Sequence, residues 1–283
     1  MATIQYIRPD WEFGRFQDID EFFKAIFPFF PDSIANSIGF VERRQLSADN
    51  GAYIINEGNV NRSPMITVNL PETAIKGLSL QDLIFSYMSQ SETISYTINR
   101  SDHPIYFNRH GIDWRIFDRS IEAETLPKVL EYSDVVPIFI ARRTELTGSN
   151  SRDFRKDQLD IPESILLPLH NGQTVQYTLV SFAVYRPGHY FAYGKSYPST
   201  DWFLYNDETV QKPDTFDIIN ELERNAVMLF YVKKGRHVTC NIPVQVEKLA
   251  ITSLIVQHIR SCFVDRVKKM VKQAKKADKK KSK

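Results

Sequence analysis

The sequence predicts an α+β fold in which an antiparallel sheet is combined with a few amphipathic helices. Runs rich in β-branched and aromatic residues follow one another at 177–185, 189–195, 201–207 and 226–234, separated by Pro-Gly, Pro-Ser and charged connections. Strands that lie so close together along a chain pair antiparallel. A helical stretch at 214–224 precedes the last of them.

Helical periodicity appears in three further segments. DIDEFFKAIFPFF, from residue 18, spaces its apolar residues at helical intervals up to Pro28. LQDLIFSYM follows Ser79, a residue type that caps helix N-termini. Residues 246–273 repeat apolar side chains without a breaker, which predicts a long helix.

The middle of the chain is less regular. Residues 40–62 mix Asn, Gly and charge without clear periodicity, whereas 64–71 is typical of a short strand closed by proline. Residues 91–119 have a strand-like, aromatic pattern, and the near-continuous apolar run at 135–142 predicts a strand buried on both faces. The polar stretch 148–157 predicts a loop.

Composition limits the class of protein. No segment approaches the roughly 18 consecutive apolar residues of a membrane span, and the charged N-terminus is unlike a signal peptide. Cys240 and Cys262 are too few for a disulfide framework and form no CxxC pair. We therefore expect an intracellular protein, cytoplasmic or nuclear, with no metal and no cofactor.

Charge is distributed unevenly. The net charge is +2, yet residues 266–283 hold ten Lys and Arg against Asp278 alone, which gives this tail +9 and the preceding residues −7. An acidic body favours a positively charged ligand. The basic tail is typical of a solvated, frayed terminus, with RNA or an anionic surface as the alternative partner.

One pair of residues has the chemistry of a catalytic dyad. His189 begins one predicted strand and Asn206 ends the next, so an antiparallel hairpin brings them to the same sheet edge. An amide oxygen can fix the tautomer of an imidazole that activates a cysteine nucleophile. Gly188, just before the histidine, allows an extended substrate backbone to approach closely. The alternative is that His189 is a surface or packing residue.

The surrounding motifs resemble those of the ubiquitin-specific protease family, peptidase family C19. YTLVSFAVYRPGHYFAYGK, DWFLYNDETV and AVMLFYVKK are similar to its Y-x-L, G-H-Y-x-x-Y, W-x-x-(F/Y)-(N/D)-D-x-x-V and A-x-x-L-(F/Y)-Y elements. Upstream, QDIDEFF, LSLQDLIFSYMSQSETI, LPKVLEYSDVVPIFIARRT and DQLDIPESILL match further elements in the same order. The resemblance implies a papain-like cysteine protease fold that retains the palm sheet and the fingers, with an incomplete thumb.

The resemblance also implies roles for individual residues. His189 would be the general base and Asn206 the third member of the triad, with Asp207 as the acid near the oxyanion site. Gly188 and Tyr190 would flank the channel for the Gly-Gly tail of ubiquitin. Asp18 and Glu21 would contact ubiquitin, or else merely solvate an exposed helix face.

The family's nucleophile is missing from its expected place. It lies in a G-N-T-C-Y box before the Q-D helix, and no cysteine precedes Gln17 here. Cys262 has the pattern of a buried thiol on the last helix, and Cys240 lies near His237 without forming a recognisable site. His103 and His110 lack the other ligands of a zinc finger.

We therefore expect a protease-like domain at 10–233, lacking the cysteine box, and a helix with a basic tail at 234–283. Three functions stay open. The chain is a pseudoenzyme that binds ubiquitin, a ubiquitin-like protein or a partner in a multiprotein assembly. Alternatively, it is an active thiol-dependent hydrolase whose nucleophile segment is absent from this chain, or it is a scaffold in RNA processing.

Overall fold

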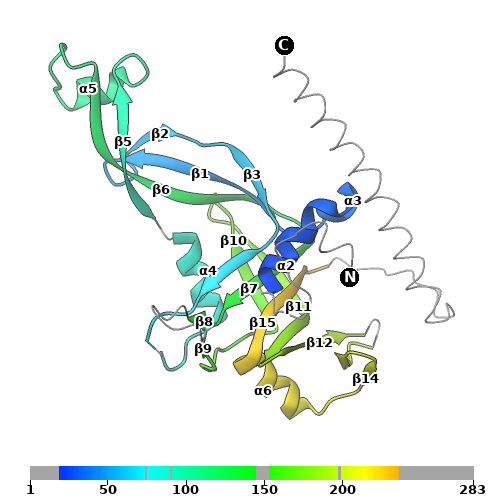
Figure 1. Ribbon diagram of the computed structural model, residues 1–283. Helices are drawn as coiled ribbons and strands as arrows, with labels where there is room; N and C mark the ends of the chain where they lie inside the picture. The colour runs from blue at the N-terminus through cyan, green and yellow to red at the C-terminus, as the bar shows by residue number, and fades with distance from the viewer. Residues whose placement is uncertain (1–18, 74, 90, 145–152, 197–198, 236–283) are drawn as a thin grey trace, which may run out of the picture. The chain divides into compact units, whose positions relative to one another are not determined.

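The computed structural model describes residues 19–73, 75–89, 91–144, 153–196 and 199–235 (Figure 1). The chain divides into two compact units, and the larger one is Ser37–Lys234. The described part of the other unit consists of residues 19–36 and Gly235. The helix predicted at 246–273 and both cysteines lie outside the described residues, so the domain boundary at 233–234 stays a prediction.

An eight-stranded sheet confirms the predicted antiparallel arrangement. Its order is β14-β13-β12-β11-β15-β7-β4, with β10 also paired to β11, and only the β4–β7 pair is parallel. The strands are β4 (Ile66–Asn69), β7 (Val135–Ala141), β10 (Ser164–Pro168), β11 (Thr174–Arg186), β12 (His189–Lys195), β13 (Trp202–Asn206), β14 (Thr209–Gln211) and β15 (Ala226–Lys233). The five central residues of β7 are buried, as its continuous apolar run predicts.

A second sheet has five strands: β1 (Phe40–Ala48), β2 (Tyr53–Asn56), β3 (Val60–Ser63), β5 (Glu92–Asn99) and β6 (Asp118–Tyr132). The first three fall where the sequence has no clear periodicity. β1 pairs with β6, which lies more than 70 residues further along the chain, so the pairing depends on contacts that a local pattern does not contain.

At the tip of this sheet, the prediction of a strand-like segment over residues 91–119 is wrong in part. The strand-like segment 91–119 includes a helix, α5 (Pro104–Arg109), at the end of the β5–β6 hairpin (Figure 1). Pro104 occupies the first helical turn, where proline is tolerated. Tyr106 and Phe107 turn inward and pack in a small core with Ile98 and Ile112. The aromatic residues of this segment are typical of a strand, but Tyr106 and Phe107 belong to a helix that packs on the small core.

Besides α5, the described residues form five helical segments. They are α2 (Ile19–Ile26), the 3-10 turn η1 (Phe27–Phe29), α3 (Asp32–Ala35), α4 (Leu80–Ser89) and α6 (Thr215–Asn225), the helix predicted before the last strand. Ser79 Oγ accepts a hydrogen bond from Asp82 N at 3.1 Å and so caps α4, as predicted. Two-residue strands β8 (Arg143–Thr144) and β9 (Asp153–Phe154) form a separate pair.

Candidate functional site

A two-residue turn places His189 at the edge of the eight-stranded sheet. Arg186 and His189 are the last paired residues of the β11–β12 hairpin, with Pro187 and Gly188 between them. Gly188 has a φ of +85°, a left-handed conformation that residues with a Cβ adopt at a cost. Pro-Gly is therefore suited to this turn, which starts β12 at the histidine.

The neighbouring strand brings Asn206 to the same place. β12 and β13 pair with Ala192 opposite Tyr205, so Asn206 lies opposite Phe191, on the sheet face that also carries His189. His189 Nε2 lies 2.6 Å from Asn206 Oδ1. The two side chains that hairpin geometry predicts to meet are thus joined by a short hydrogen bond; we call them the dyad, and their role in catalysis stays a prediction.

This contact fixes the form of the imidazole. An amide oxygen only accepts hydrogen bonds, so Nε2 must carry the proton. In the neutral ring, Nδ1 is then the basic nitrogen, as a general base requires. The His189 side chain is 41% exposed, which leaves the ring accessible from solvent.

Asp207 interacts with His189 more weakly than Asn206 does. It follows Asn206 in the turn to β14 and has a φ of +50°, which aspartate tolerates better than most residues. Its Oδ2 lies 3.8 Å from His189 Nε2, and its side chain is 79% exposed. Solvent screens a carboxylate in this position, so Asn206 is the direct partner of the imidazole.

The other predicted site residues are placed differently. Tyr190 follows His189 in β12 and therefore points to the opposite face, where its ring lies 4.9 Å from that of Tyr185. Glu21 lies exposed on α2, in the smaller unit. Asp18 lies outside the described residues.

Two residues next to the dyad, Phe191 and Arg186, and a third that contacts Arg186 were not predicted. Phe191 stacks on His189 with ring centroids 6.1 Å apart, and the Arg186 guanidinium lies 5.4 Å from the Phe191 centroid. Arg186 forms an ion pair with Glu221 of α6, which is only 4% exposed. The period of two along a strand could have indicated Phe191, whereas nothing local in the sequence indicates Glu221.

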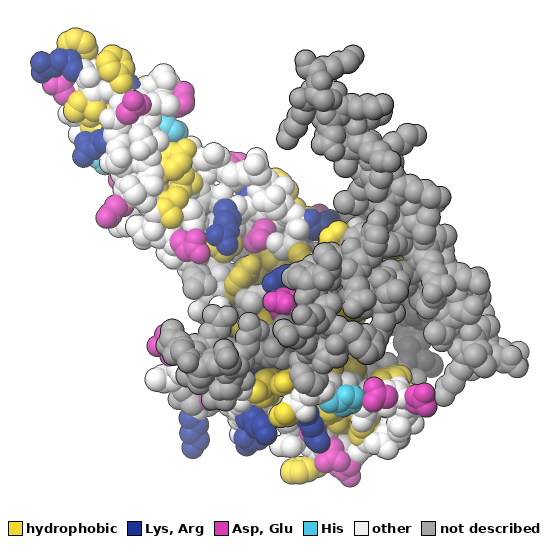
Figure 2. All heavy atoms as spheres, in the orientation of Figure 1, with side chains coloured by type: hydrophobic (Ala, Val, Ile, Leu, Met, Phe, Trp, Pro, Cys, Tyr) yellow, Lys and Arg dark blue, Asp and Glu magenta, His cyan; other side chains and the backbone are white. Residues whose placement is uncertain are grey.

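The tip around α5 is a candidate contact surface. Ile105, Trp114 and Phe117 are 70%, 74% and 68% exposed, and hydrophobic side chains gather at this tip in Figure 2. Single exposed apolar residues are ordinary on a protein surface, but a cluster of them is typical of an interaction site.

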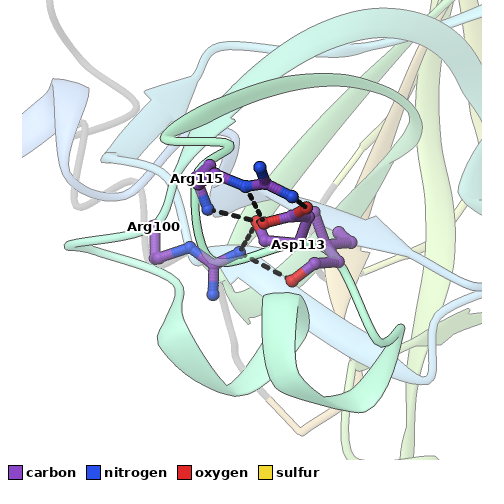
Figure 3. A network of polar contacts seen from close by, with 4 residues as sticks. Arg100, Asp113 and Arg115 are labelled. Atoms are coloured by element: carbon purple, nitrogen blue, oxygen red, sulfur yellow. Dashed lines mark hydrogen bonds and ion pairs between the residues drawn. The ribbon is translucent and has the colours of Figure 1, made fainter.

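The loop that carries this tip is firmly held. Arg100 donates from its guanidinium to the carbonyl oxygens of Ile112, Asp113 and Ile116 at 2.7 to 3.1 Å. Arg115 pairs with the Asp113 carboxylate through two hydrogen bonds, of 3.1 and 2.7 Å (Figure 3). The Arg115 side chain holds the pKa of Asp113 below its usual value.

The described residues contain no group of three His, Cys, Asp or Glu side chains placed to hold a metal ion. His103 Nδ1 contacts the Tyr53 hydroxyl at 3.3 Å, and His110 Nε2 contacts Asp49 at 2.9 Å, so the two histidines have different partners. Within the same part of the chain, no helix has the length and hydropathy needed to cross a membrane.

The α+β arrangement of the described residues is similar to the papain-like fold of a solved ubiquitin-specific protease domain. A family model described as ubiquitin carboxyl-terminal hydrolase matches residues 1–231. The chain belongs to this family, and its domain is of the ubiquitin-specific protease type. No match was found among curated proteins.

Solved structures with the same fold have distant sequences. One is a SAGA DUB module of Ubp8, Sgf11, Sus1 and Sgf73 bound to monoubiquitin: TM-score 0.56, 13% identity, 78% of this chain and 49% of that chain covered. The module bound to ubiquitin aldehyde gives a TM-score of 0.57 at 13% identity, with 78% and 50% covered. A yeast module with a mutant Sgf73 gives 0.52 at 13% identity, with 78% and 47% covered. This chain thus spans about half the length of the chains it matches.

Proposed function

We propose that this chain is a ubiquitin-specific-protease-like protein that binds ubiquitin or a partner and is catalytically inactive on its own. The observation that carries the proposal is the His189–Asn206 hydrogen bond of 2.6 Å, made in a sequence that has no cysteine before Cys240. A general base with its orienting amide, but without the thiol ahead of the Q-D helix, can hold a substrate tail without cleaving it.

Ubiquitin is the ligand that the family relation favours. Two of the solved structures are complexes with monoubiquitin or ubiquitin aldehyde. The negative charge of residues 1–265, which is −7, favours a ligand whose contact surface is basic. The same modules contain several chains, which supports a multiprotein assembly as the setting for this protein.

We assign the tail of ubiquitin to the sheet edge. It would run past Gly188, where the turn lacks a side chain, toward His189, Asn206 and Asp207. Tyr190, Asp18 and Glu21 stay proposed contacts on the resemblance alone. The exposed tip at Trp114 would provide a second contact, because the Arg100 bonds hold it in place before binding and so reduce the entropy lost on association.

Calorimetric titration of the full chain with ubiquitin tests the proposal. We expect saturable binding, which Trp114→Ala weakens about tenfold because a large exposed anchor is lost. Phe216→Ala is the matched control, since Phe216 on α6 is 76% exposed against 74% for Trp114. Absence of saturable heat with the unmodified chain would contradict ubiquitin binding and leave a scaffold function.

The alternative is an active thiol-dependent hydrolase whose nucleophile comes from a segment that this chain does not contain. The intact geometry of the dyad favours it, because a 2.6 Å bond from Nε2–H to Asn206 Oδ1 selects the tautomer in which Nδ1 can accept a proton. A ubiquitin probe with an electrophilic C-terminus separates the two when it is applied to the native protein purified from its source. Under our proposal no adduct forms, whereas an adduct on a cysteine from outside residues 1–283 would support the active enzyme. A thioether that disappears in Cys240→Ser would contradict both, because Cys240 belongs to this chain.

We further propose a domain at 10–233, followed by the helix and basic tail at 234–283, in an intracellular protein of the cytoplasm or nucleus. Two isolated cysteines are suited to a reducing compartment. A purified 1–235 fragment that unfolds cooperatively, with the unfolding free energy of the full chain, would support these boundaries.

A further inference from the structure

A row of aromatic rings along β12 ends at the imidazole of His189. His189, Phe191 and Tyr193 alternate along the strand and therefore share one face. The Phe191 and Tyr193 centroids are 5.9 Å apart, and Tyr193 stacks on Phe182 at 4.7 Å. Because Tyr193 is 4% exposed, the row extends from the buried core to the half-exposed imidazole.

Phe191 also contacts Arg186, on the neighbouring strand β11. Arg186 lies directly across the hairpin from His189, and its guanidinium lies 5.4 Å from the Phe191 centroid, within the range of a cation–π contact. The ion pair with buried Glu221 anchors this guanidinium and raises the pKa of Arg186. Glu221 is anchored in turn, because it accepts a hydrogen bond from Asn225 Nδ2 at 2.9 Å.

The dyad needs such support because a single hydrogen bond fixes one atom of the imidazole but not the plane of the ring. The Asn206 contact holds Nε2, and 41% of the His189 side chain remains exposed. The Phe191 ring lies against the imidazole at an interplanar angle of 29°. The 6.1 Å between the two centroids is within the range in which aromatic rings attract each other, so the Phe191 ring is placed where it can oppose rotation of the imidazole about the hydrogen bond.

We propose that Phe191 is a positioning residue for His189, braced by Arg186 and Glu221, and that it keeps the imidazole in the plane where Nε2–H points at Asn206. This role for Phe191 rests on the proposed function, because it assumes that the tail of ubiquitin binds beside His189 and Asn206. Its test observes the imidazole directly, so a failure of ubiquitin binding would leave the result unchanged.

The test measures the tautomer ratio of His189 by long-range proton–nitrogen NMR on the full chain, at about pH 9, where histidine is neutral. In Phe191→Leu we expect the ratio of Nε2–H to Nδ1–H to fall about fivefold, the factor for one net hydrogen bond. Asn206→Ala serves as the reference for complete loss of the bond. Phe191→Tyr keeps the ring and should keep the ratio of the unmodified chain.

His170 is an internal control, since its Nδ1 lies 3.2 Å from the Val129 carbonyl oxygen, away from the dyad. An unchanged His189 ratio in folded Phe191→Leu, with a fall in Asn206→Ala, would mean that Phe191 only packs and would overturn the proposal. If Phe191→Leu does not fold, Glu221→Gln decides. A fall in the ratio supports the proposal, and an unchanged ratio overturns it.

Discussion

At the residue scale, the hydrogen bond between His189 and Asn206 determines what the imidazole can do. The contact is 2.6 Å long and half-exposed, so its effect is on the proton position more than on stability. Asp207, at 3.8 Å and 79% exposed, provides a comparison within the same turn. A neutral amide at hydrogen-bond distance orients the base better than a screened carboxylate beyond it.

The contribution of this contact to stability is modest, so Asn206→Ala should cost about 1 kcal/mol of unfolding free energy, the net value of one hydrogen bond. Asp207→Asn should change it by less than about 0.5 kcal/mol, because surface charges contribute little. Urea unfolding of both variants measures the difference. Equal losses of unfolding free energy in the two variants would indicate that Asp207 also stabilises the turn. That result would contradict the assignment of Asn206 alone as the direct partner of His189.

At the element scale, a buried arginine joins three chain segments. Arg142 follows β7 and is 1% exposed. It donates to the carbonyl oxygens of Ala226 at 2.8 Å, Glu223 at 2.7 Å and Asp157 at 2.8 Å. Burial lowers its pKa to about 10, so it stays a cation at neutral pH. Arg142 thus fixes the junction of α6 and β15, and α6 carries Glu221, the ion-pair partner of Arg186.

Arg142→Gln should destabilise the protein by on the order of 3 kcal/mol, since the shorter side chain leaves buried carbonyl oxygens without donors. Arg44→Gln is the matched control. Arg44 forms an ion pair with Glu92 at 3.4 Å, and both side chains are more than 60% exposed. We expect less than about 0.5 kcal/mol there. A small effect in both variants, by urea unfolding, would contradict the role of Arg142 as a junction.

Elements that depend on local contacts could be predicted from the sequence, and elements that depend on distant contacts could not. His189 and Asn206 could be paired in advance, because a hairpin with short connections is local and strand ends meet at one edge. Gly188 and Ser79 were predictable from turn and cap chemistry. Strands β1 to β3 could not be predicted, since β1 is specified by distant β6. Phe191 follows the period of two, but its partner Glu221 depends on how α6 packs.

At the scale of the whole molecule, three buried tyrosines tie the core to surrounding loops. Tyr132, Tyr177 and Tyr231 donate to the carbonyl oxygens of Pro168 at 2.9 Å, Ser133 at 2.5 Å and Pro162 at 2.7 Å. Burial raises the pKa of each well above its usual value of about 10. The folded state therefore requires neutral phenols.

Stability should fall at alkaline pH as a result. The contribution of each raised pKa is complete below the unfolded value near 10 and is lost as the pH rises from there toward the folded value. Each tyrosine adds up to about 1.4 kcal/mol per pH unit to the fall in unfolding free energy with pH. Urea unfolding from pH 9 to 12 measures this slope, and Tyr177→Phe should make it less steep by up to about 1.4 kcal/mol per pH unit. An unchanged slope in that variant would contradict the assignment.

The central claim is that the sheet edge bearing His189 receives the tail of ubiquitin. The most direct test follows the His189 ring signals by NMR while the full chain is titrated with ubiquitin or with ubiquitin lacking its C-terminal Gly-Gly. We predict saturable shifts of His189 with intact ubiquitin and little shift with the truncated form, while His170 stays unchanged in both. Equal responses to the two ligands, or none to either, would contradict the claim.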